Sequence, residues 1–201
     1  MMARTSNVAD SLSPHNAAFF TYWERLATIE RPPGKPAINP ADIRRLLQSL
    51  VIYEGKDPAV FKIRLMGTSI VQRIGIDLTG RNLLDFFHYA AKEEAQQDLN
   101  RIVDGPCGQL LVVKDRFTSG REAWVEVVRL PLTDEAGQTR FIIGCTEQKE
   151  TTGFVYGQRD EPELIAERIK GFFFDLQGKV LPETIWQNPD HALPDEIGKG
   201  W

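Results

Sequence analysis

The stretch from residue 108 to residue 147 constrains the fold most, because it has the pattern of three β-strands joined by tight turns. Apolar and β-branched residues dominate roughly 108–117, 122–131 and 139–147. The two connections, Thr118–Arg121 and Asp134–Gly137, each contain a glycine and polar side chains, as hairpin turns do. Strands joined by such short turns pair antiparallel. The stretch therefore predicts an antiparallel meander and argues against a doubly wound parallel sheet.

Two further strands and a helical region are predicted before this meander. Leu50–Tyr53 is a short apolar strand that the turn-rich run Glu54–Pro58 is expected to end. In the next strand Phe61, Ile63 and Leu65 alternate with charged residues, which indicates one buried face. Helical structure is then expected over three segments, Thr68–Ile74, Asn82–Phe87 and His88–Val103. Five antiparallel strands that flank a helical cluster make an α+β fold.

Two helices are predicted ahead of the first strand. Ser13 and Pro14 suit the N-cap and the first turn of a helix. Its apolar stripe, at three- and four-residue spacing, consists of Phe19, Tyr22, Trp23, Leu26 and Ile29. A second, shorter helix is expected to start at Asn39 and Pro40. Its buried face would consist of Ile43, Leu46, Leu47 and Leu50.

Composition limits the class of protein. The chain has 201 residues, of which 42% are hydrophobic and 26% charged, so it is long and apolar enough for one globular domain with extensions. A net charge of −4 disfavours nucleic-acid binding. The sequence contains neither a membrane-spanning apolar run nor an apolar signal segment at its start. We therefore expect a soluble, cytoplasmic protein that binds no nucleic acid and no membrane.

Charge and proline content divide the chain into three parts. The whole net negative charge falls in residues 149–201, which also contain four prolines. We expect a flexible N-terminus over 1–15, a folded domain over 16–148 and an acidic extension over 149–201. Within the extension Asp160–Phe172 is predicted to be helical, and the final twenty residues to be loosely ordered.

This order of elements resembles a PAS domain, and more closely a bacterial PAS subfamily whose first helix bears a tryptophan. The resemblance covers about 16–148 and includes the three closing strands. Its motifs are YWERL at 22–26, NPADIRRLLQSLVIYE at 39–54 and FKIRLMGTSIVQRIGIDLTGRNLLDFF at 61–87. It implies a five-stranded antiparallel sheet that cups a small cavity under the helical cluster. It also implies signalling instead of catalysis, with the output carried by another molecule.

Within such a fold the ligand cavity is expected between the apolar face of the strands and the overlying helices. The candidate lining residues are Ile63, Leu65, Phe86, Phe87, Leu99, Trp124, Val128, Phe141 and Ile143. Trp124, in the middle of a strand, is expected to be buried. A cavity filled wholly by these side chains would instead make a ligand-free interaction or assembly protein. That alternative stays open, as does a small enzyme on the same scaffold.

The sequence indicates no particular cofactor or metal. His15, His88 and His191 lie far apart and lack the spacing of metal ligands. Some PAS domains bind haem through a histidine on the helix that His88 opens, but an ordinary surface histidine is the favoured interpretation. Light-sensing PAS domains carry a flavin-reactive cysteine near the segment that resembles 82–87 here. This chain has no cysteine there, which argues against flavin photochemistry.

Other catalytic patterns are missing as well. Cys107 and Cys145 are too few for a disulfide framework and are expected to serve in packing. The sequence contains neither a G-x-S-x-G motif nor a phosphate-binding glycine loop. We therefore predict a protein that is not an enzyme and whose ligand, if it has one, is unknown.

The first helix also suggests how the chain associates. Its stripe from Phe19 to Ile29 is more aromatic than docking on one sheet requires. Twofold symmetric dimers are the commonest oligomers, so a homodimer with this helix at its interface is predicted. The competing possibility is that all five side chains pack on the chain's own sheet.

Arg64 interrupts an apolar strand and needs an acidic partner if its face is covered. Glu24 and Asp42 are the candidates. An arginine that reaches solvent at the edge of the sheet is equally compatible with the pattern.

Overall fold

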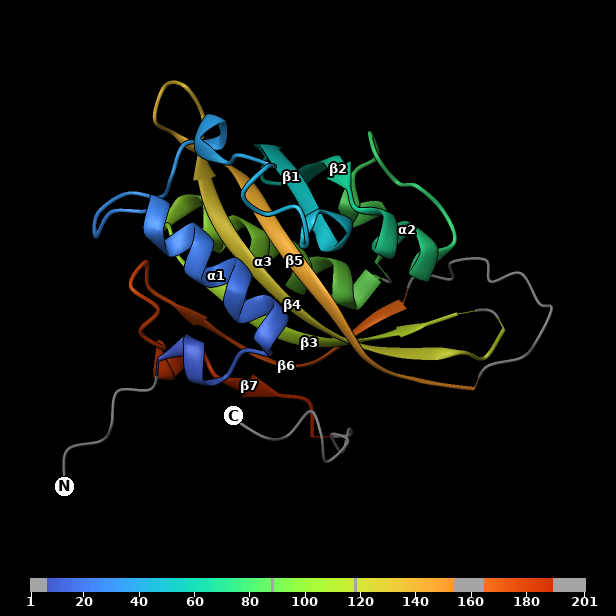
Figure 1. Ribbon diagram of the computed structural model, residues 1–201. Coiled ribbons are helices and arrows are strands. Elements are labelled where there is room, and N and C mark those ends of the chain that lie inside the picture. The colour runs from blue at the N-terminus through green and yellow to red at the C-terminus, as the bar shows by residue number, and fades with distance from the viewer. Residues whose placement is uncertain (1–6, 88, 118, 154–164, 190–201) are drawn as a thin grey trace.

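The computed structural model describes residues 7–87, 89–117, 119–153 and 165–189. Within these residues, seven strands form one antiparallel sheet in the order β2-β1-β5-β4-β3-β6-β7 (Figure 1). The strands are β1 (Leu50–Asp57), β2 (Val60–Met66), β3 (Gly108–Arg116), β4 (Glu122–Thr133), β5 (Thr139–Thr152), β6 (Ile165–Phe174) and β7 (Trp186–Gln187). The α-helices are α1 (Pro14–Leu26), α2 (Thr68–Ile74) and α3 (Tyr89–Asp104). Short 3-10 helices are η1 (Val8–Asp10), η2 (Lys35–Ala37), η3 (Leu47–Ser49), η4 (Leu83–Phe86) and η5 (Pro182–Thr184).

The predicted meander and the α+β class are confirmed. β3, β4 and β5 pair antiparallel in succession, and β1 pairs with β5 so that the β1–β2 hairpin extends the sheet on one side. β1 is longer than expected, because Glu54, Gly55 and Asp57 pair with β2. Pro58, the last residue of the predicted turn, and Ala59 connect the two strands.

Helix α1 begins where the sequence predicts, and β4 holds its first turn. The Ser13 hydroxyl caps the helix by accepting a hydrogen bond from the Asn16 backbone N–H (3.4 Å). Oε1 of buried Glu126 accepts three more hydrogen bonds, from the Ser13 N–H (3.0 Å), the Ser13 hydroxyl (2.7 Å) and the Asn16 side-chain amide (2.8 Å). Further along, the Trp23 indole donates to the Pro131 carbonyl (3.0 Å). These contacts fix α1 to one face of the sheet.

The aromatic stripe of α1 forms much of the core on that face. Phe19 and Trp23 are fully buried and Tyr22 almost so, whereas Leu26 is 36% and Ile29 74% exposed. Of the five residues predicted at a dimer interface, the three aromatic ones are thus covered by the chain itself. In this conformation only Leu26 and Ile29 have surface to offer a second chain.

The prediction of a second helix that starts at Asn39 and Pro40 is wrong, because the segment does not form an α-helix. Residues 40–46 form successive turns, and η3 follows. The Asn39 side chain does cap the segment, because it accepts a hydrogen bond from the Ala41 N–H (3.1 Å). The Leu46 N–H then donates to the Ile43 carbonyl (2.8 Å), a bond over three residues. Three-residue spacing keeps Ile43 and Leu46 on one side, so both are buried, whereas Leu47 is exposed.

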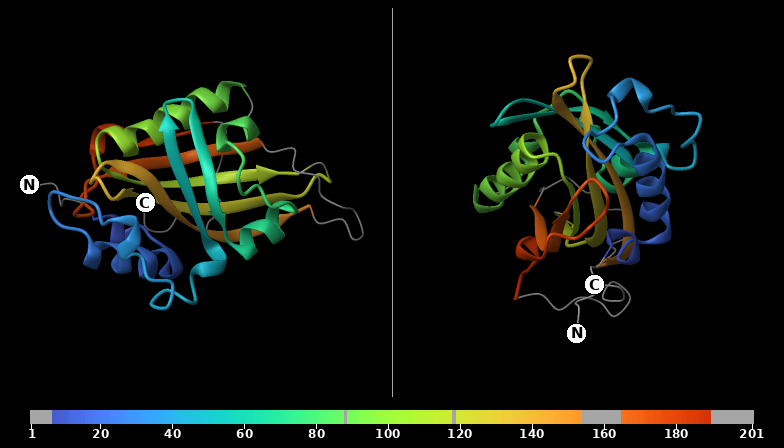
Figure 2. Two further views of the ribbon diagram at one scale, coloured as in Figure 1. Left: turned by 90° about the horizontal axis from the view of Figure 1, so that it is seen from above. Right: turned by 90° about the vertical axis from the view of Figure 1, so that its left-hand side faces the viewer.

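The helical cluster covers the opposite face of the sheet, as predicted. Figure 2 (right) shows α1 and α3 on opposite sides of the strands. Helix α2 contributes Ile70 and Ile74 to this second core, and α3 contributes Leu99 and Ile102. The molecule therefore has three layers, with a separate apolar core on each face of the sheet.

The C-terminal extension overturns two predictions. The helix expected over 160–172 is a strand from Ile165 to Phe174, and residues 160–164 lie outside the described residues. β6 pairs with β3 along its length, which satisfies backbone groups that a five-stranded sheet would leave at its edge. Phe172 and Phe174 join the core under α1, and Phe173 joins the core under α3. The sheet therefore continues across the predicted boundary at residue 148.

The described part of the predicted flexible N-terminus packs against this extension. Asn7 forms a β-bridge with Lys179, and the Val8 N–H donates to the Gly178 carbonyl (2.7 Å). Val8 is fully buried. Residues 7–15 are therefore an ordered part of the fold.

A β-bulge in β2 determines the surroundings of Arg64 and Leu65. Tyr53 pairs with Ile63 and Ile52 with Leu65, which leaves Arg64 as an extra residue in β2. Arg64 forms an ion pair with Glu54 of the neighbouring strand. The prediction that Glu24 or Asp42 pairs with Arg64 is wrong. Because of the bulge, the Arg64 side chain reaches the neighbouring strand β1 instead.

Candidate ligand-binding cavity

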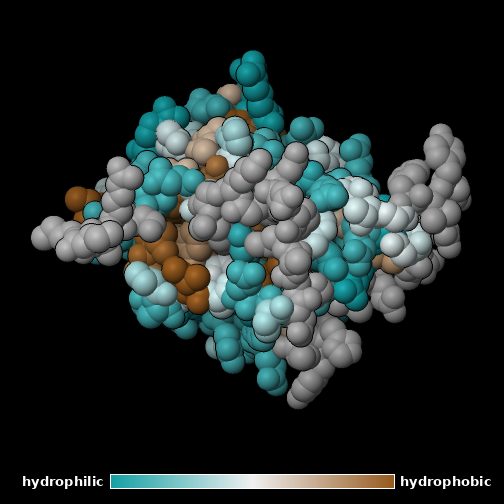
Figure 3. Space-filling view, turned by 90° about the horizontal axis from the view of Figure 1, so that it is seen from below, coloured by the Kyte–Doolittle hydropathy of each residue, from teal (hydrophilic) through white to brown (hydrophobic). Residues whose placement is uncertain are grey.

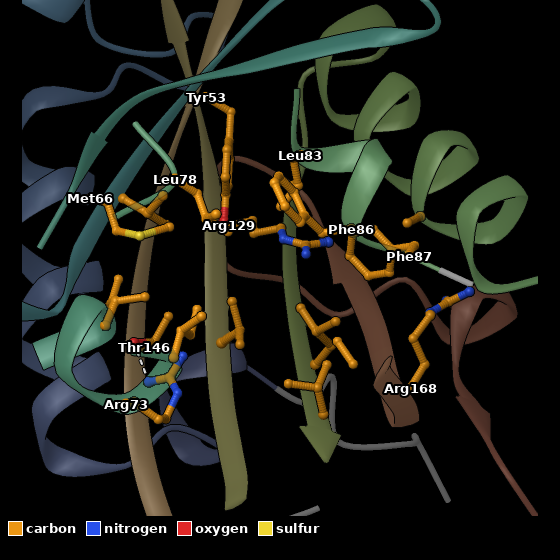
Figure 4. A pocket seen from close by; sticks show the side chains of 18 residues that line it. Tyr53, Met66, Arg73, Leu78, Leu83, Phe86, Phe87, Arg129, Thr146 and Arg168 are labelled. Carbon is orange, nitrogen blue, oxygen red and sulfur yellow. Dashed lines mark hydrogen bonds between the residues drawn. The ribbon is translucent and has the colours of Figure 1, made fainter. Parts of the chain in front are cut away.

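The described residues enclose a cavity of about 90 Å³ between the sheet and the helical cluster. Its walls come from β1, β3, β4, β5 and β6 on one side and from α2, η4 and α3 on the other (Figure 4). The lining is mostly apolar and includes Val51, Ile70, Leu78, Leu111, Val113 and Val127. A water molecule occupies about 30 Å³ of liquid. The cavity in this conformation therefore suits a molecule of a few non-hydrogen atoms.

Two of the nine predicted cavity residues line this space. Phe86 and Phe87, at the end of η4, point into it (Figure 4). Ile63 and Leu99 belong to the surrounding core without lining the cavity. Leu65 is 41% exposed because of the bulge in β2.

The remaining four residues lie on the other side of the sheet. Val128 and Ile143 belong to the core under α1, and Phe141 packs against it. Trp124 is buried as predicted, with Val112 and Ile169. The prediction chose the wrong face of β4 and β5, because neighbouring side chains of a strand point in opposite directions.

Polar side chains of β1, β5 and α2 reach the cavity. Arg73 of α2 donates from Nη1 to the Thr146 hydroxyl (3.3 Å) and from Nε to Oδ2 of Asp115 (3.1 Å). Burial raises the pKa of the Asp115 carboxyl, and Arg73 opposes that shift. Tyr53 projects from β1 with its hydroxyl in the cavity (Figure 4). Burial raises the pKa of Tyr53, so the phenol stays protonated and can donate a hydrogen bond.

Arg129 of β4 is the least compensated of these groups. It is 6% exposed, and its Nη1 donates to the neutral Gln109 side-chain oxygen (3.0 Å). Gln109 in turn donates to Oδ2 of Asp98 on α3 (2.6 Å). The Arg129 Nε is buried and has no hydrogen-bond partner among the described residues. Burial lowers the pKa of Arg129, which reflects the unfavourable free energy of a cation in this setting.

The C-terminal extension supplies the last wall. Arg168 of β6 lines the cavity and donates to Glu94 (Nη1, 2.7 Å) and Asp98 (Nη2, 2.9 Å) of α3. Its guanidinium lies 4.2 Å from the centre of the Trp186 ring of β7. β6 and β7 are thereby connected to the helix that covers the cavity. This wall was missed because the segment was predicted to be helical.

The histidines and cysteines do not form a site within the described residues. That part of the chain contains no group of three or more potential metal ligands. His88 and His191 lie outside it, so the haem hypothesis for His88 stays untested. Burial raises the pKa of Cys107 to about 11 and that of Cys145 to about 12, and neither lines the cavity.

Comparison with protein families identifies this architecture. A family model described as a PAS domain matches residues 12–147. The chain belongs to the PAS domain family. The predicted resemblance is thus confirmed, whereas the subfamily with a tryptophan in its first helix stays a prediction. PAS domains are in general sensory modules without catalysis that bind a ligand or a partner.

Several solved structures of low sequence identity are similar to part of this chain. One is a light-oxygen-voltage domain studied with a flavin analogue, at 19% identity and a TM-score of 0.43, over 55% of this chain and 83% of that one. The dark structure of the Aureochrome1 light-oxygen-voltage domain has 17% identity and a TM-score of 0.43, over 60% and 89%. VqmA bound to DPO has 18% identity and a TM-score of 0.42, over 55% and 58%. A search of curated proteins finds no match. Among the described residues, no helix has the length and apolarity to cross a membrane.

Proposed function

We propose that this PAS domain is a sensory module that binds a small ligand in its cavity and passes the signal to another molecule. The observation that carries the proposal is the cavity itself. It is mostly apolar, but Tyr53, Arg73 and Arg129 place polar groups on its wall. Apolar pockets with a few inward polar groups are the usual form of small-molecule sites.

The walls of the cavity offer a physical route for the signal. Arg168 connects β6 to α3 through Asp98 and Glu94, and both elements line the cavity. A ligand that prefers one arrangement of α3 and β6 shifts the population towards it by its difference in affinity. A partner that contacts either element then detects whether the cavity is occupied.

Native mass spectrometry of the purified full-length protein tests ligand binding directly. We expect a bound small molecule that is released on denaturation. The variant Ala95→Leu adds three carbons at a buried position on the cavity wall and is expected to abolish that adduct. Gln97→Leu, on the exposed side of the same helix, adds a similar apolar group and should retain it.

The absence of a bound small molecule would contradict the proposal. A protein that carries no adduct, and that becomes more stable when Ala95→Leu fills the cavity, would have a simple packing void. The chain would then be the ligand-free interaction module that the sequence left open.

Association into a homodimer is the second part of the proposal. Leu26 and Ile29, at the end of α1 and just beyond it, expose apolar side chains to solvent. Figure 3 shows a further apolar area on the lower face of the molecule, amid a hydrophilic surface. Exposed apolar surface favours association, and a twofold dimer is its commonest form.

A further inference from the structure

The charges around the cavity do not balance. Three guanidinium groups line it, those of Arg73, Arg129 and Arg168. Arg73 is paired with buried Asp115, and Arg168 with buried Asp98. No carboxylate of the described residues forms an ion pair with Arg129. The cavity wall thus carries about one positive charge more than its buried carboxylates compensate.

Glu94 does not remove this excess. It also bonds Arg168, but its side chain is 59% exposed on the outer side of that guanidinium. Solvent screens a carboxylate at such a position, whereas a charge on the wall of an apolar cavity is screened little. The least compensated group is therefore the Arg129 guanidinium, on which Asp98 acts only at a distance and without an ion pair.

Arg129 lines the cavity, and one of its donors, the Nε–H, is unsatisfied among the described residues although it lies beneath the surface of the wall. Nη1 is engaged with Gln109 at 3.0 Å, whereas Nε has no partner among the described residues although it is buried. Figure 4 shows the Tyr53 hydroxyl beside Arg129, with both side chains directed at the space that Phe86 borders. The Tyr53 hydroxyl and the Arg129 guanidinium are thus two donors at one part of the wall.

We propose that the ligand is a short-chain monocarboxylate whose carboxylate binds Arg129 and the Tyr53 hydroxyl. This inference rests on the proposed function and specifies its ligand class. A carboxylate supplies an acceptor for the Arg129 guanidinium and the negative charge that the wall lacks. The guanidinium of arginine suits a carboxylate because its donors lie in one plane.

Size and lining favour a carboxylate with a short apolar tail over an inorganic anion. The volume of about 90 Å³ is that of a small molecule, in the size range of acetate and propionate. Most of the remaining wall is apolar and includes Leu111, Val113 and Val127. Phosphate would place oxygen atoms against these groups without hydrogen-bond partners, which is unfavourable.

Thermal unfolding and calorimetry of the full-length protein test the class of ligand. The probes are sodium propionate, propionamide as a neutral molecule of the same shape, and sodium phosphate and chloride at equal ionic strength. Propionate is expected to raise the unfolding midpoint by about 5–10 °C at about 100 times its Kd. Propionamide, phosphate and chloride are expected to cause no saturable shift.

Two variants locate the site. Arg129→Met keeps the length of the side chain and removes the charge, and it should fold because an apolar residue replaces a poorly compensated buried cation. It is expected to weaken propionate binding at least tenfold. Tyr53→Phe removes only the hydroxyl and is expected to weaken it several-fold. Arg44→Met, at an exposed position remote from the cavity, is the matched control and should bind as the wild type does.

Several results would overturn the carboxylate inference. Equal binding of propionamide and propionate, or unchanged propionate binding in both Arg129→Met and Tyr53→Phe, would overturn the carboxylate inference and leave the proposed function intact. Phosphate or chloride bound through Arg129 as tightly as propionate would also overturn it. The carboxylate inference would also be overturned if none of the carboxylates from acetate to butyrate binds at 50 mM. Native mass spectrometry would then test the proposed function separately.

Discussion

Phe174 connects the C-terminal extension to the core under α1, and its replacement by alanine measures how much that connection stabilises the fold. The side chain is fully buried, and its ring meets the rings of Phe20 and Phe172 edge-on, with centroids 5.6 and 6.5 Å apart. Truncation of a buried phenylalanine to alanine costs about 3–5 kcal/mol. For a chain of this length each kcal/mol lowers the unfolding midpoint by about 2–4 °C. Phe174→Ala should therefore lower it by about 6–20 °C.

Gly108 allows the same contact to be tested from the other strand. It is the cross-strand partner of Phe174, and a β-carbon added there would overlap the Phe174 ring. Gly108→Ala alone is expected to destabilise by about 1–3 kcal/mol through overpacking. In a Phe174→Ala background the overlap is gone, so the added methyl should change stability by less than about 0.5 kcal/mol.

Urea denaturation of the four proteins in this double-mutant cycle is the assay. Ile185→Ala, at a 60% exposed position of the same extension, is the control and should change the midpoint little. Additive effects of the two substitutions would refute the cross-strand contact. A Phe174→Ala protein as stable as the wild type would show that the Phe174 side chain does not stabilise the fold.

Three further predictions follow from burial and exposure. Trp124→Ala should destabilise by about 3–5 kcal/mol in urea, because the residue is only 7% exposed; an unchanged midpoint would place the ring on the surface. Cys107 and Cys145 should resist alkylation at pH 8 in the native protein, because burial raises their pKa values to about 11 and about 12. Both should react in urea, and fast native labelling would contradict their burial. Light scattering should give a dimer mass for the full chain and a smaller mass for the Leu26→Ser/Ile29→Ser variant; a monomeric wild type would exclude the dimer.

Elements with local signals could be predicted from the sequence. The start of α1 follows from Ser13 and Pro14, whose capping geometry involves only neighbouring residues. The bounds of α2 follow in the same way, because Gly67 precedes it and Gly75, with φ of 86°, ends it in a left-handed conformation. The strands of the meander were recognisable because their turns and apolar residues lie close together in the chain.

The face of β4 that borders the cavity could not be predicted from local sequence signals. Val125 and Val127 point to one face, and Trp124 and Val128 to the other, so both faces look apolar. Alternation specifies a face only when the other face is polar. The useful signal was Arg129, since a buried arginine within such a strand marks the face where a polar or anionic group is needed.

The strand character of β6 depends on residues far away in the sequence. Ile165, Ile169 and Phe172 have the spacing of a helix, and the charged residues between them support that reading. The segment is a strand because β3 offers it a full row of backbone partners. Pairing between residues about 50 to 66 positions apart is a tertiary effect that overrides local propensity.

Because β6 is part of the sheet and of the cavity wall, ligand binding and the docking of the extension are thermodynamically connected. Ala166 and Arg168 line the cavity from β6, and Arg168 bonds α3 from the same strand. A ligand that requires this wall stabilises the docked strand. Suppose that a partner binds the extension only when β6 is undocked. The ligand then lowers the affinity of the partner for the extension, and the partner lowers the affinity of the cavity for the ligand by the same factor. Reciprocity of this kind would let the domain act as a sensor, since the free energy of ligand binding appears as a change in the exposure of β6.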